Sequence, residues 1–429
     1  MLINFKTSNY LSFKDEVLLT LSATAIKEFA DSNVFEPEYP REKLLKTAAI
    51  YGYNSAGKSN LLKAMEFMKK FVLNSAKDFQ ANEQIETDVF KLNTQTLKRP
   101  SCFEIEFIHD RKRFKYGFNT TKERVTKEYL YEQRGGKSHM YFERLFDKYM
   151  IDKNLKEANG LEVKTRANAL FLSVMAQWNV LLAVRILSWF QELVFLNDIT
   201  FRVYFNHTIS LLADENKKRQ LLKMFKAADL GFDNVEVSKQ ITIDDDVLNS
   251  LPDEVKKALE ARSLDKPQVL TFHRRFNEKG ENAGFVQLNL SSEESLGTQK
   301  YFAIAGYILE ALLQGGIILI DELDARFHSH LATSIVRFFN SAKDNPMNAQ
   351  LIFSTHNTNL LSEELLRRDQ VYFVEKDDFG SSKLFTIMDK GRRNDASFEK
   401  EYLRGEYGAI PKERPQLNLF DDDDKLTLF

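Results

Sequence analysis

A glycine-bounded loop followed by a lysine and a serine carries the clearest chemistry in this chain. Its residues are Gly52-Tyr53-Asn54-Ser55-Ala56-Gly57-Lys58-Ser59-Asn60, and they lie between the apolar run Thr47–Tyr51 and the helix formers Leu61–Met65. In a strand–loop–helix context, such glycines let backbone N–H groups face phosphate oxygens, the lysine reaches the β- and γ-phosphates, and the serine hydroxyl binds Mg²⁺. A chance match in a glycine-containing turn is the alternative, and the flanking segments argue against it. The loop therefore predicts a nucleotide site, with these nine residues as its binding residues.

An acidic pair supplies the second part of that chemistry. Asp321 and Glu322 directly follow Ile317-Ile318-Leu319-Ile320, an all-apolar run typical of a buried strand. Ligands bind at the carboxyl ends of such strands in parallel sheets. We expect Asp321 to hold Mg²⁺ together with Ser59, and Glu322 to deprotonate the water that attacks the γ-phosphate. A helix N-cap is the alternative for an isolated Asp-Glu pair.

Two further polar residues follow neighbouring predicted strands. Asp324 lies in Leu323-Asp324-Ala325, and His356 ends Ser354-Thr355-His356 after the apolar run Gln350–Phe353. A lone histidine is more often structural. At this position we expect His356 to contact the γ-phosphate and the attacking water, and we assign His356, Asp324 and Glu322 as catalytic residues.

The order of these motifs resembles that of ABC-type ATPases, within the SMC/RecF/OLD branch. More narrowly, the chain is similar to bacterial ATPases of the RloA/AbiLi kind, found in anti-phage and abortive-infection operons. The resemblance covers nearly the whole chain and rests on Asn4-Phe5, Ser12-Phe13-Lys14, Tyr51 to Asn60, Glu294 to Thr298, Asp321 to Asp324, Ser354 to Thr358, Asp369 to Lys376 and Tyr407 to Pro411.

The resemblance implies a signature loop, and Glu294-Ser295-Leu296-Gly297-Thr298 is placed to supply it, ahead of a helix predicted over 298–314. A simple helix cap is the alternative. In ABC-type dimers this loop meets the γ-phosphate held by the other subunit. Ser295, Gly297 and Thr298 are therefore expected to act in trans, and the chain is expected to be a homodimer or a higher homo-oligomer that uses ATP and Mg²⁺ and hydrolyses ATP.

Two features depart from the families that the chain resembles. The glutamine of the ABC Q-loop is not assigned, because neither Gln84 nor Gln95 has convincing flanks. OLD-family nucleases also carry a Toprim domain, whereas too few residues follow His356 for an ordinary domain of about 100 residues. We therefore expect a separate effector, such as an RloB-like protein or a Toprim nuclease, and a DNA or phage-protein trigger.

The fold expected from these patterns is α/β, with an ABC-type P-loop NTPase core, an antiparallel β meander and an inserted, largely helical lobe. The predicted meander includes 103–108, 113–119 and 125–133, and further helices are predicted over 185–196, 213–228, 252–262, 328–343 and 358–367. The expected division is 1–165 for the first half of the core, 166–285 for the lobe, 286–390 for the second half, and 391–429 for a polar tail with the acidic run Asp421–Asp424.

Composition limits the alternatives. The 429 residues carry a net charge of −2, so DNA binding would need a local basic patch. Cys102 is the single cysteine, which fits a reducing cytoplasm. Met1–Lys6 lacks the apolar region of a signal peptide, and Ala169–Val184 is interpreted as a buried helix rather than a membrane span.

Three function classes remain at this point: a defence ATPase that controls a separate effector, a RecF- or SMC-like DNA clamp, and a transporter subunit. No sustained heptad lies between Lys58 and Asp321, which disfavours SMC-type coiled coils. A RecF-like clamp would use clusters such as 111–113 or 217–219. The large internal lobe makes a transporter subunit the least favoured class.

Overall fold

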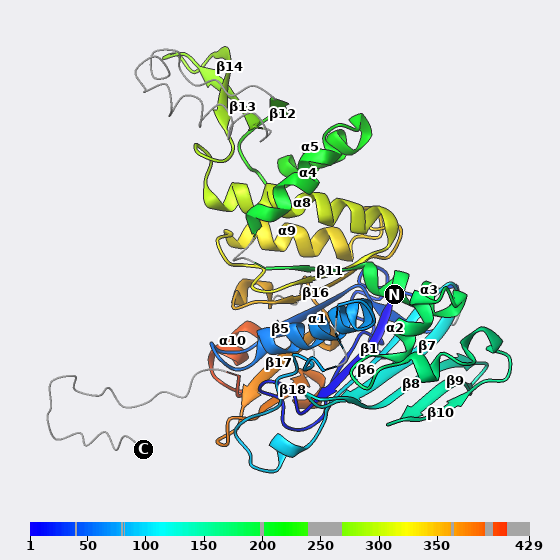
Figure 1. The fold of residues 1–429 in the computed structure, drawn as a ribbon. Coiled ribbons are helices and arrows are strands. Elements are labelled where there is room, and N and C mark those ends of the chain that lie inside the picture. Colours follow the sequence, from blue (N-terminus) through cyan, green and yellow to red (C-terminus); the bar gives the residue numbers. More distant parts are fainter. Residues whose placement is uncertain are drawn as a thin grey trace, which may run out of the picture.

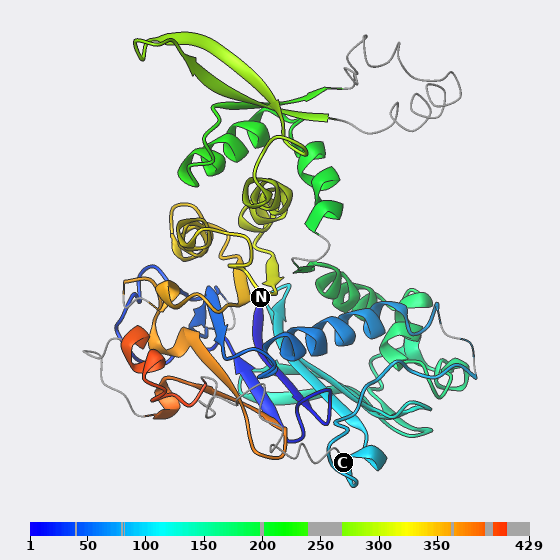
Figure 2. The same cartoon turned by 90° about the vertical axis from the view of Figure 1, so that its left-hand side faces the viewer.

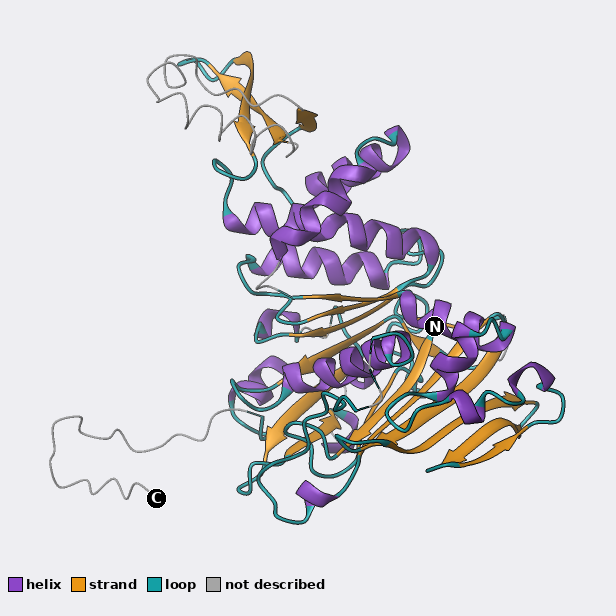
Figure 3. Cartoon of the chain, in the orientation of Figure 1, coloured by secondary structure: helices purple, strands orange, loops and turns teal. Residues whose placement is uncertain are grey.

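The computed structural model describes the chain except for residues 39–40, 79, 81, 198–200, 239–267, 362–363, 391–397 and 410–429. The helix predicted over 252–262, the acidic run Asp421–Asp424 and most of the predicted tail lie outside the described residues. The described part is built around two large sheets, with helices between and above them (Figures 1 and 3).

A six-stranded sheet forms the core. Its strand order is β11-β15-β16-β5-β17-β18, and its first five strands are parallel while β18 pairs antiparallel with β17. The strands are β5 (Thr47–Tyr51), β11 (Leu193–Leu196), β15 (Ile317–Ile320), β16 (Gln350–Ser354), β17 (Val371–Lys376) and β18 (Ser382–Thr386). β5, β15 and β16 are buried along their whole length, as expected for a parallel sheet covered on both faces.

Side chains that alternate along these strands enter two different cores. Ile317 and Leu319 pack with α1 (Lys58–Asn74), whereas Ile318 and Ile320 pack with α8 (Leu296–Gln314) and α9 (Ser329–Asn340). The period of two in a strand produces this separation. Figures 1 and 2 accordingly show α1 on one face of the sheet and α8 and α9 on the other.

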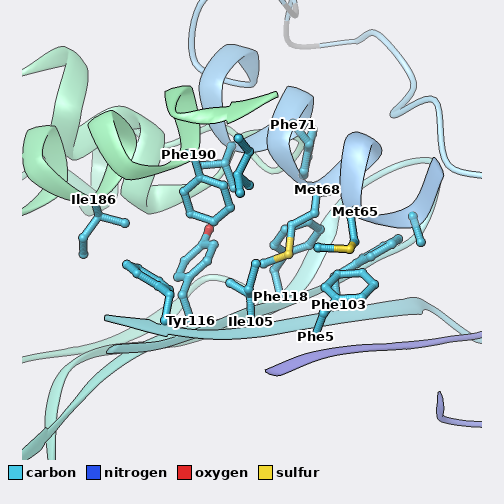
Figure 4. Close-up of a cluster of buried hydrophobic side chains, with 14 of the residues drawn as sticks. Phe5, Met65, Met68, Phe71, Phe103, Ile105, Tyr116, Phe118, Ile186 and Phe190 are labelled. Carbon is cyan, nitrogen blue, oxygen red and sulfur yellow. The ribbon is translucent and has the colours of Figure 1, made fainter. Parts of the chain in front are cut away.

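The predicted antiparallel meander is confirmed as part of a seven-stranded sheet, ordered β10-β9-β8-β7-β6-β1-β2. Its strands are β1 (Leu2–Ser8), β2 (Val17–Thr20), β6 (Ser101–His109), β7 (Lys112–Thr120), β8 (Val125–Arg134), β9 (Lys137–Leu145) and β10 (Lys148–Ile151). Met65, Met68 and Phe71 of α1 lie over its inner face, against Phe103 and Phe118 (Figure 4). This packing fixes α1 between the two sheets.

Two shorter helices, α2 (Phe171–Gln177) and α3 (Leu181–Gln191), cover the rest of the meander. The sequence predicted continuous helical spacing here, but the chain turns at Asn179, whose φ is 59°. Among the described residues no single helix is long and apolar enough to cross a membrane; α2 and α3 pass that test only as a pair bent by 107°.

The helix predicted over 185–196 is wrong at its end. α3 stops at Gln191, and Leu193–Leu196 form β11, which pairs in parallel with β15. The helix predicted over 358–367 is also wrong, because the described part of that segment holds only a 3₁₀ turn at Thr358–Leu360.

Above the core, α4 (Phe205–Leu211) and α5 (Glu215–Ala227) pack on α8, and a three-stranded arm projects beyond them (Figure 1). The arm consists of β12 (Asn234–Ser238), β13 (Gln268–Phe276) and β14 (Asn282–Asn289). Two small elements complete the description, the β3–β4 pair (Val34–Phe35 and Leu44–Leu45) and α10 (Phe398–Leu403). The four-part domain division stays a proposal. Within 166–285, α2 and α3 pack against the meander and β11 is a strand of the core sheet.

Candidate active site

The glycine-bounded loop connects the carboxyl end of β5 to the first turn of α1. Ser55 has a φ of 68° and Gly57 a φ of 119°, so the loop passes through left-handed backbone that favours glycine at the second position. A Cβ at Gly57 would lie within 3 Å of the hydroxyl oxygens of Ser12 and Ser382. The loop is therefore packed between the β1–β2 turn and β18, and any side chain at Gly57 would displace it.

Lys58, the first residue of α1, is nearly fully buried. Its Nζ lies 2.9 Å from the carbonyl oxygen of Gly52 and 2.8 Å from Nε2 of His356. Burial lowers the pKa of Lys58 to about 8, although the nearby carboxylates of Asp321, Glu322 and Asp324 favour its charged form. Phosphate oxygens entering this loop would supply the opposite charge that the buried ammonium needs.

Ser59 and Asp321 come from different segments and meet at the same edge of the sheet. The Ser59 hydroxyl donates to Oδ1 of Asp321 at 3.0 Å, and the Ser354 hydroxyl donates to the same oxygen at 2.5 Å. A hydroxyl beside a carboxylate is the oxygen donor set that Mg²⁺ prefers. The arrangement fits the predicted role of Ser59 and Asp321 as the residues that would hold the ion.

Glu322 follows Asp321 in an unusual backbone conformation, with a φ of 53°. Left-handed backbone is disfavoured for a residue with a Cβ, so the surroundings must hold it there. The N–H of Glu322 donates to the Ser354 hydroxyl at 2.8 Å, and the N–H of Leu323 donates to the Ser354 carbonyl at 3.0 Å. Its side chain is solvent-exposed at the edge of the site.

Asp324 and His356, which follow the neighbouring strands β15 and β16, lie beside each other. Oδ1 of Asp324 accepts from the Thr355 hydroxyl at 2.6 Å and from the His356 N–H at 3.3 Å. Burial, and then the charge of Lys58, lower the pKa of His356, so its ring is neutral at pH 7 and Nε2 can accept a hydrogen bond from Lys58.

The predicted signature segment begins α8. Ser295 is the N-cap residue, and its hydroxyl accepts from the Thr298 N–H at 3.1 Å. A Cβ at Gly297 would lie 2.7 Å from the carbonyl oxygen of Arg326, so this glycine allows the segment to touch the loop after Glu322 in its own chain. The closest contact of Gly297 outside its own segment is thus Arg326, in the loop that follows Glu322 and Asp324.

The structure also identifies residues that the sequence reasoning missed. Ser354 bridges Asp321 and Glu322, and the buried Lys300 of α8 donates to the carbonyl oxygens of Glu322 and Ala325. A lysine directly before the buried apolar run Tyr301–Ala305 is the signal that could have indicated Lys300.

The glutamines considered for the Q-loop lie elsewhere. Gln84 is exposed in the segment before β6, and the side chain of Gln95 accepts from Arg99 at 3.4 Å. β11 ends at Leu196, whose carbonyl oxygen accepts from the Asp321 N–H at 3.0 Å, so Asn197 is the first residue after β11 at this edge of the core sheet.

Solved structures resemble this chain at low sequence identity. No curated protein matches the chain by sequence. The chain is similar to the SMC head domain from Thermotoga maritima, with 15% identity, a TM-score of 0.41, and coverage of 90% of this chain and 98% of that one. It is also similar to the Smc head domain with an extended coiled coil bound to the C-terminal domain of ScpA from Pyrococcus furiosus, with 12% identity, a TM-score of 0.39, and coverage of 95% and 98%.

A family match covers residues 48–362, which include the phosphate-binding loop, Asp321, Glu322 and His356. The family is described as "AAA domain, putative AbiEii toxin, Type IV TA system". The match spans well over half of the chain, and this chain therefore belongs to that AAA-domain family of P-loop ATPases.

Proposed function

We propose that this protein is an ABC-type ATPase that binds and hydrolyses Mg²⁺-ATP at a homodimer interface and acts as the sensor and scaffold of a bacterial anti-phage system. The observation that carries the enzymatic part is the convergence of Lys58, Ser59, Asp321 and His356 at one edge of the core sheet. Bound Mg²⁺ would neutralise charge that develops on the phosphates. Lys58 binds and orients the phosphates, and Glu322 accepts the proton of the attacking water.

The shared-site part of the proposal is supported by the position of the signature segment. Ser295 caps α8, which packs on the face of the sheet opposite to α1. The N-terminus of α8 presents the positive end of a helix dipole, which suits an anion. A second copy of the chain, related by a two-fold axis, would bring this N-terminus to the other copy's phosphates and complete two equivalent sites.

Mixing two inactive variants tests whether the sites are shared. Lys58→Ala removes the phosphate-binding cation, and Ser295→Asp places a carboxylate where a γ-phosphate would approach. Aspartate is a good N-cap residue, so Ser295→Asp keeps α8 intact. Gly297 is a poorer target, because any Cβ there would lie 2.7 Å from the Arg326 carbonyl oxygen of its own chain and would disturb that chain's own loop.

Each variant alone is expected to be inactive. If each site takes Lys58 and Ser295 from different chains, a mixed dimer carries both lesions in one site and keeps the other intact. Random mixing should then restore about a quarter of the wild-type rate, because half of the dimers each retain one of two sites. ATP-dependent dimerisation is measured in the same samples by light scattering. Absence of both recovery and an ATP-dependent dimer overturns the shared-site proposal.

The defence role is supported by the family's description, which names a toxin of a type IV toxin–antitoxin system, and by the resemblance to RloA/AbiLi-like ATPases. The proposed effector is a separate protein, either RloB-like or a Toprim nuclease, and the trigger is DNA or a phage protein. Cells that carry the gene together with its neighbouring genes, referred to as the operon, are infected with a phage panel, with Glu322→Gln as the matched variant. Equal plaque counts with the operon, without it and with the variant across the panel would contradict this role.

The contacts of the basic clusters disfavour the DNA-clamp alternative. Arg111 pairs with Glu38, Arg113 with Glu42 and Glu106 at 2.6 Å, and Lys217 with Glu310 at 3.3 Å. Basic side chains that are already paired with carboxylates attract DNA phosphates less strongly. Tight DNA binding by the isolated protein, falling steeply with salt, would favour the clamp instead.

A further inference from the structure

Lys300 is a buried cation on the helix that the signature segment begins. It lies in the first turns of α8, close behind Ser295 and Gly297, and is 1% exposed. Its Nζ lies 2.7 Å from the carbonyl oxygen of Ala325 and 3.2 Å from that of Glu322, and 4.6 Å from the centre of the Phe327 ring. Burying an ammonium is costly unless such groups compensate its charge. The two carbonyl oxygens must therefore stay within hydrogen-bond distance of Lys300.

One carbonyl that Lys300 contacts belongs to a strained residue of the predicted site. Glu322 has a φ of 53°, and left-handed backbone is disfavoured for a residue with a Cβ. Both of its peptide groups are held: its N–H by the Ser354 hydroxyl at 2.8 Å, and its carbonyl by the Ala325 N–H at 3.0 Å and by Lys300. The contacts are therefore arranged to keep Glu322 in this conformation.

We propose that Lys300 is a positioning residue that holds the turn from Glu322 to Ala325 of its own chain, and thereby aims the Glu322 carboxylate. This inference rests on the proposed function. Lys300 acts through the backbone and not on the nucleotide, so its loss changes the catalytic step while ATP binding remains.

A different role would follow from the position of Lys300 on α8. By anchoring that helix, it could place Ser295 and Gly297 of the same chain for the partner's nucleotide. The two roles differ in which site of a dimer a lesion damages. Acting through Glu322, a lesion damages the site that contains the chain's own Lys58. Acting through the signature segment, it damages the opposite site.

The first measurement uses Lys300→Met, which preserves the length of the side chain and removes the ammonium. We expect kcat to fall by about 10- to 100-fold, the range for losing a group that orients a site residue from outside, with the ATP Kd unchanged within about twofold. Lys300→Arg should recover a large part of kcat, because a guanidinium can also donate to two carbonyls. Lys46→Met is the matched control, since Lys46 is 2% exposed and precedes β5 at the opposite end of that strand.

Thermal unfolding of all three variants separates a folding defect from a catalytic one. Lys300→Met takes the ammonium from two carbonyl oxygens and is expected to unfold at a somewhat lower temperature than the wild type while remaining folded in the assay. An unchanged kcat in Lys300→Met, or a loss of ATP affinity as large as the loss of kcat, overturns the inference. If Lys300→Met does not fold, the kcat and Kd of Lys300→Arg decide, and equal losses in both again overturn it.

Mixed dimers then locate the lesion. Lys300→Met mixed with Ser295→Asp should recover activity, because both lesions fall in the same site. Lys300→Met mixed with Lys58→Ala should not rise above the residual rate of Lys300→Met, because the lesions fall in different sites. The reverse pattern assigns Lys300 to the signature segment and overturns the proposal.

The mixture of Ser295→Asp with Lys58→Ala distinguishes failure of this inference from failure of the proposed function. If that mixture recovers and the Lys300 mixtures show the reverse pattern, the sites are shared and only the role of Lys300 is wrong. If that mixture shows neither recovery nor an ATP-dependent dimer, the shared-site proposal is wrong. The role of Lys300 is then decided by kcat and Kd of Lys300→Met alone.

Discussion

Nζ of Lys58 lies 2.8 Å from Nε2 of His356, although 298 residues separate the two along the chain. They meet because Lys58 follows β5 and His356 follows β16, and these strands are parallel neighbours whose carboxyl ends share one edge. The same ammonium donates to the Gly52 carbonyl at 2.9 Å. Incoming phosphates would compete with His356 for Lys58, so binding of the nucleotide is coupled to the state of the histidine.

The lowered pKa of Lys58 predicts that ATP binding takes up a proton. Burial places this pKa at about 8, and a bound phosphate raises it by supplying an opposite charge. Below pH 8 the lysine is already protonated, so affinity is constant there; above pH 8 the free protein must gain a proton on binding, and affinity falls. We therefore expect little proton uptake per site at pH 7, and uptake that rises toward one proton well above pH 8.

Calorimetry in buffers of different ionisation enthalpy measures this uptake directly. Lys63, on the exposed side of α1, provides a control, because Lys63→Ala should leave the pH dependence unchanged. Uptake that does not vary between pH 7 and 9 would show that Lys58 is not the group that the nucleotide contacts.

Ser354 is predicted to be needed for both metal affinity and turnover. Its hydroxyl donates to Asp321 at 2.5 Å and accepts from the Glu322 N–H at 2.8 Å, so Ser354→Ala leaves one oxygen and one N–H without these partners. We expect the apparent Mg²⁺ affinity to weaken by about 10- to 100-fold, the usual cost of losing a group that supports a metal ligand. Titration of ATPase activity with Mg²⁺ checks this, with Ser341→Ala as the control at an exposed loop bonded to Asp344.

Local sequence pattern was sufficient to predict the elements whose own residue types are distinctive. Ile317–Ile320 and Gln350–Ser354 are recognisable as buried strands from their length and apolarity, and the structure places strands at the same residues. The loop before Lys58 was predicted from its glycine spacing and its flanking segments. A fully buried strand requires apolar residues, and a tightly curved loop requires glycine at its left-handed positions. These requirements limit the residue types that are possible in each segment.

Elements defined by distant partners could not be predicted in this way. Leu193–Leu196 continue the apolar pattern of α3 and look helical, yet they form a strand because β15, far along the chain, pairs with them. Lys300 escaped notice for a similar reason: it is bonded to backbone carbonyls, which every residue has. Contacts to the backbone leave no signature in the sequence of the partner.

A buried ion pair in the meander predicts a stability effect separate from the site. Arg144 and Glu128 are both almost inaccessible, and Glu128 accepts from the N–H groups of Phe171 and Leu172 at 2.6 and 2.9 Å. Arg144→Met leaves a buried carboxylate without its cation, and should lower the free energy of unfolding by about 3–5 kcal/mol. Urea unfolding measures the change.

The control for that prediction is Arg134→Met in the same sheet. Arg134 pairs with Glu132 at 2.8 Å but is half-exposed, and exposed pairs contribute only about 0–1 kcal/mol. Equal destabilisation by the two substitutions would contradict the argument from burial. ATP affinity of Arg144→Met, measured where it is folded, should remain that of the wild type.

Glu322→Gln is predicted to separate ATP binding from hydrolysis. Glutamine has nearly the same shape, so the left-handed turn, its bond to Ser354 and its contact with Lys300 can remain. What is lost is the ability to accept a proton from water, whereas Lys58, Ser59 and Asp321 are unchanged.

We therefore expect the ATP Kd of Glu322→Gln to stay within about twofold of the wild-type value while kcat falls at least about 100-fold, within the usual range for loss of a general base. Because the bound ATP is no longer hydrolysed, the variant should accumulate as an ATP-dependent dimer, which light scattering detects. The residues that follow do not replace the lost carboxylate, because Leu323 is buried and apolar and Asp324 already accepts from Thr355 and His356. Wild-type turnover in Glu322→Gln would remove Glu322 from the catalytic role and leave Asp324 as the carboxylate to test next.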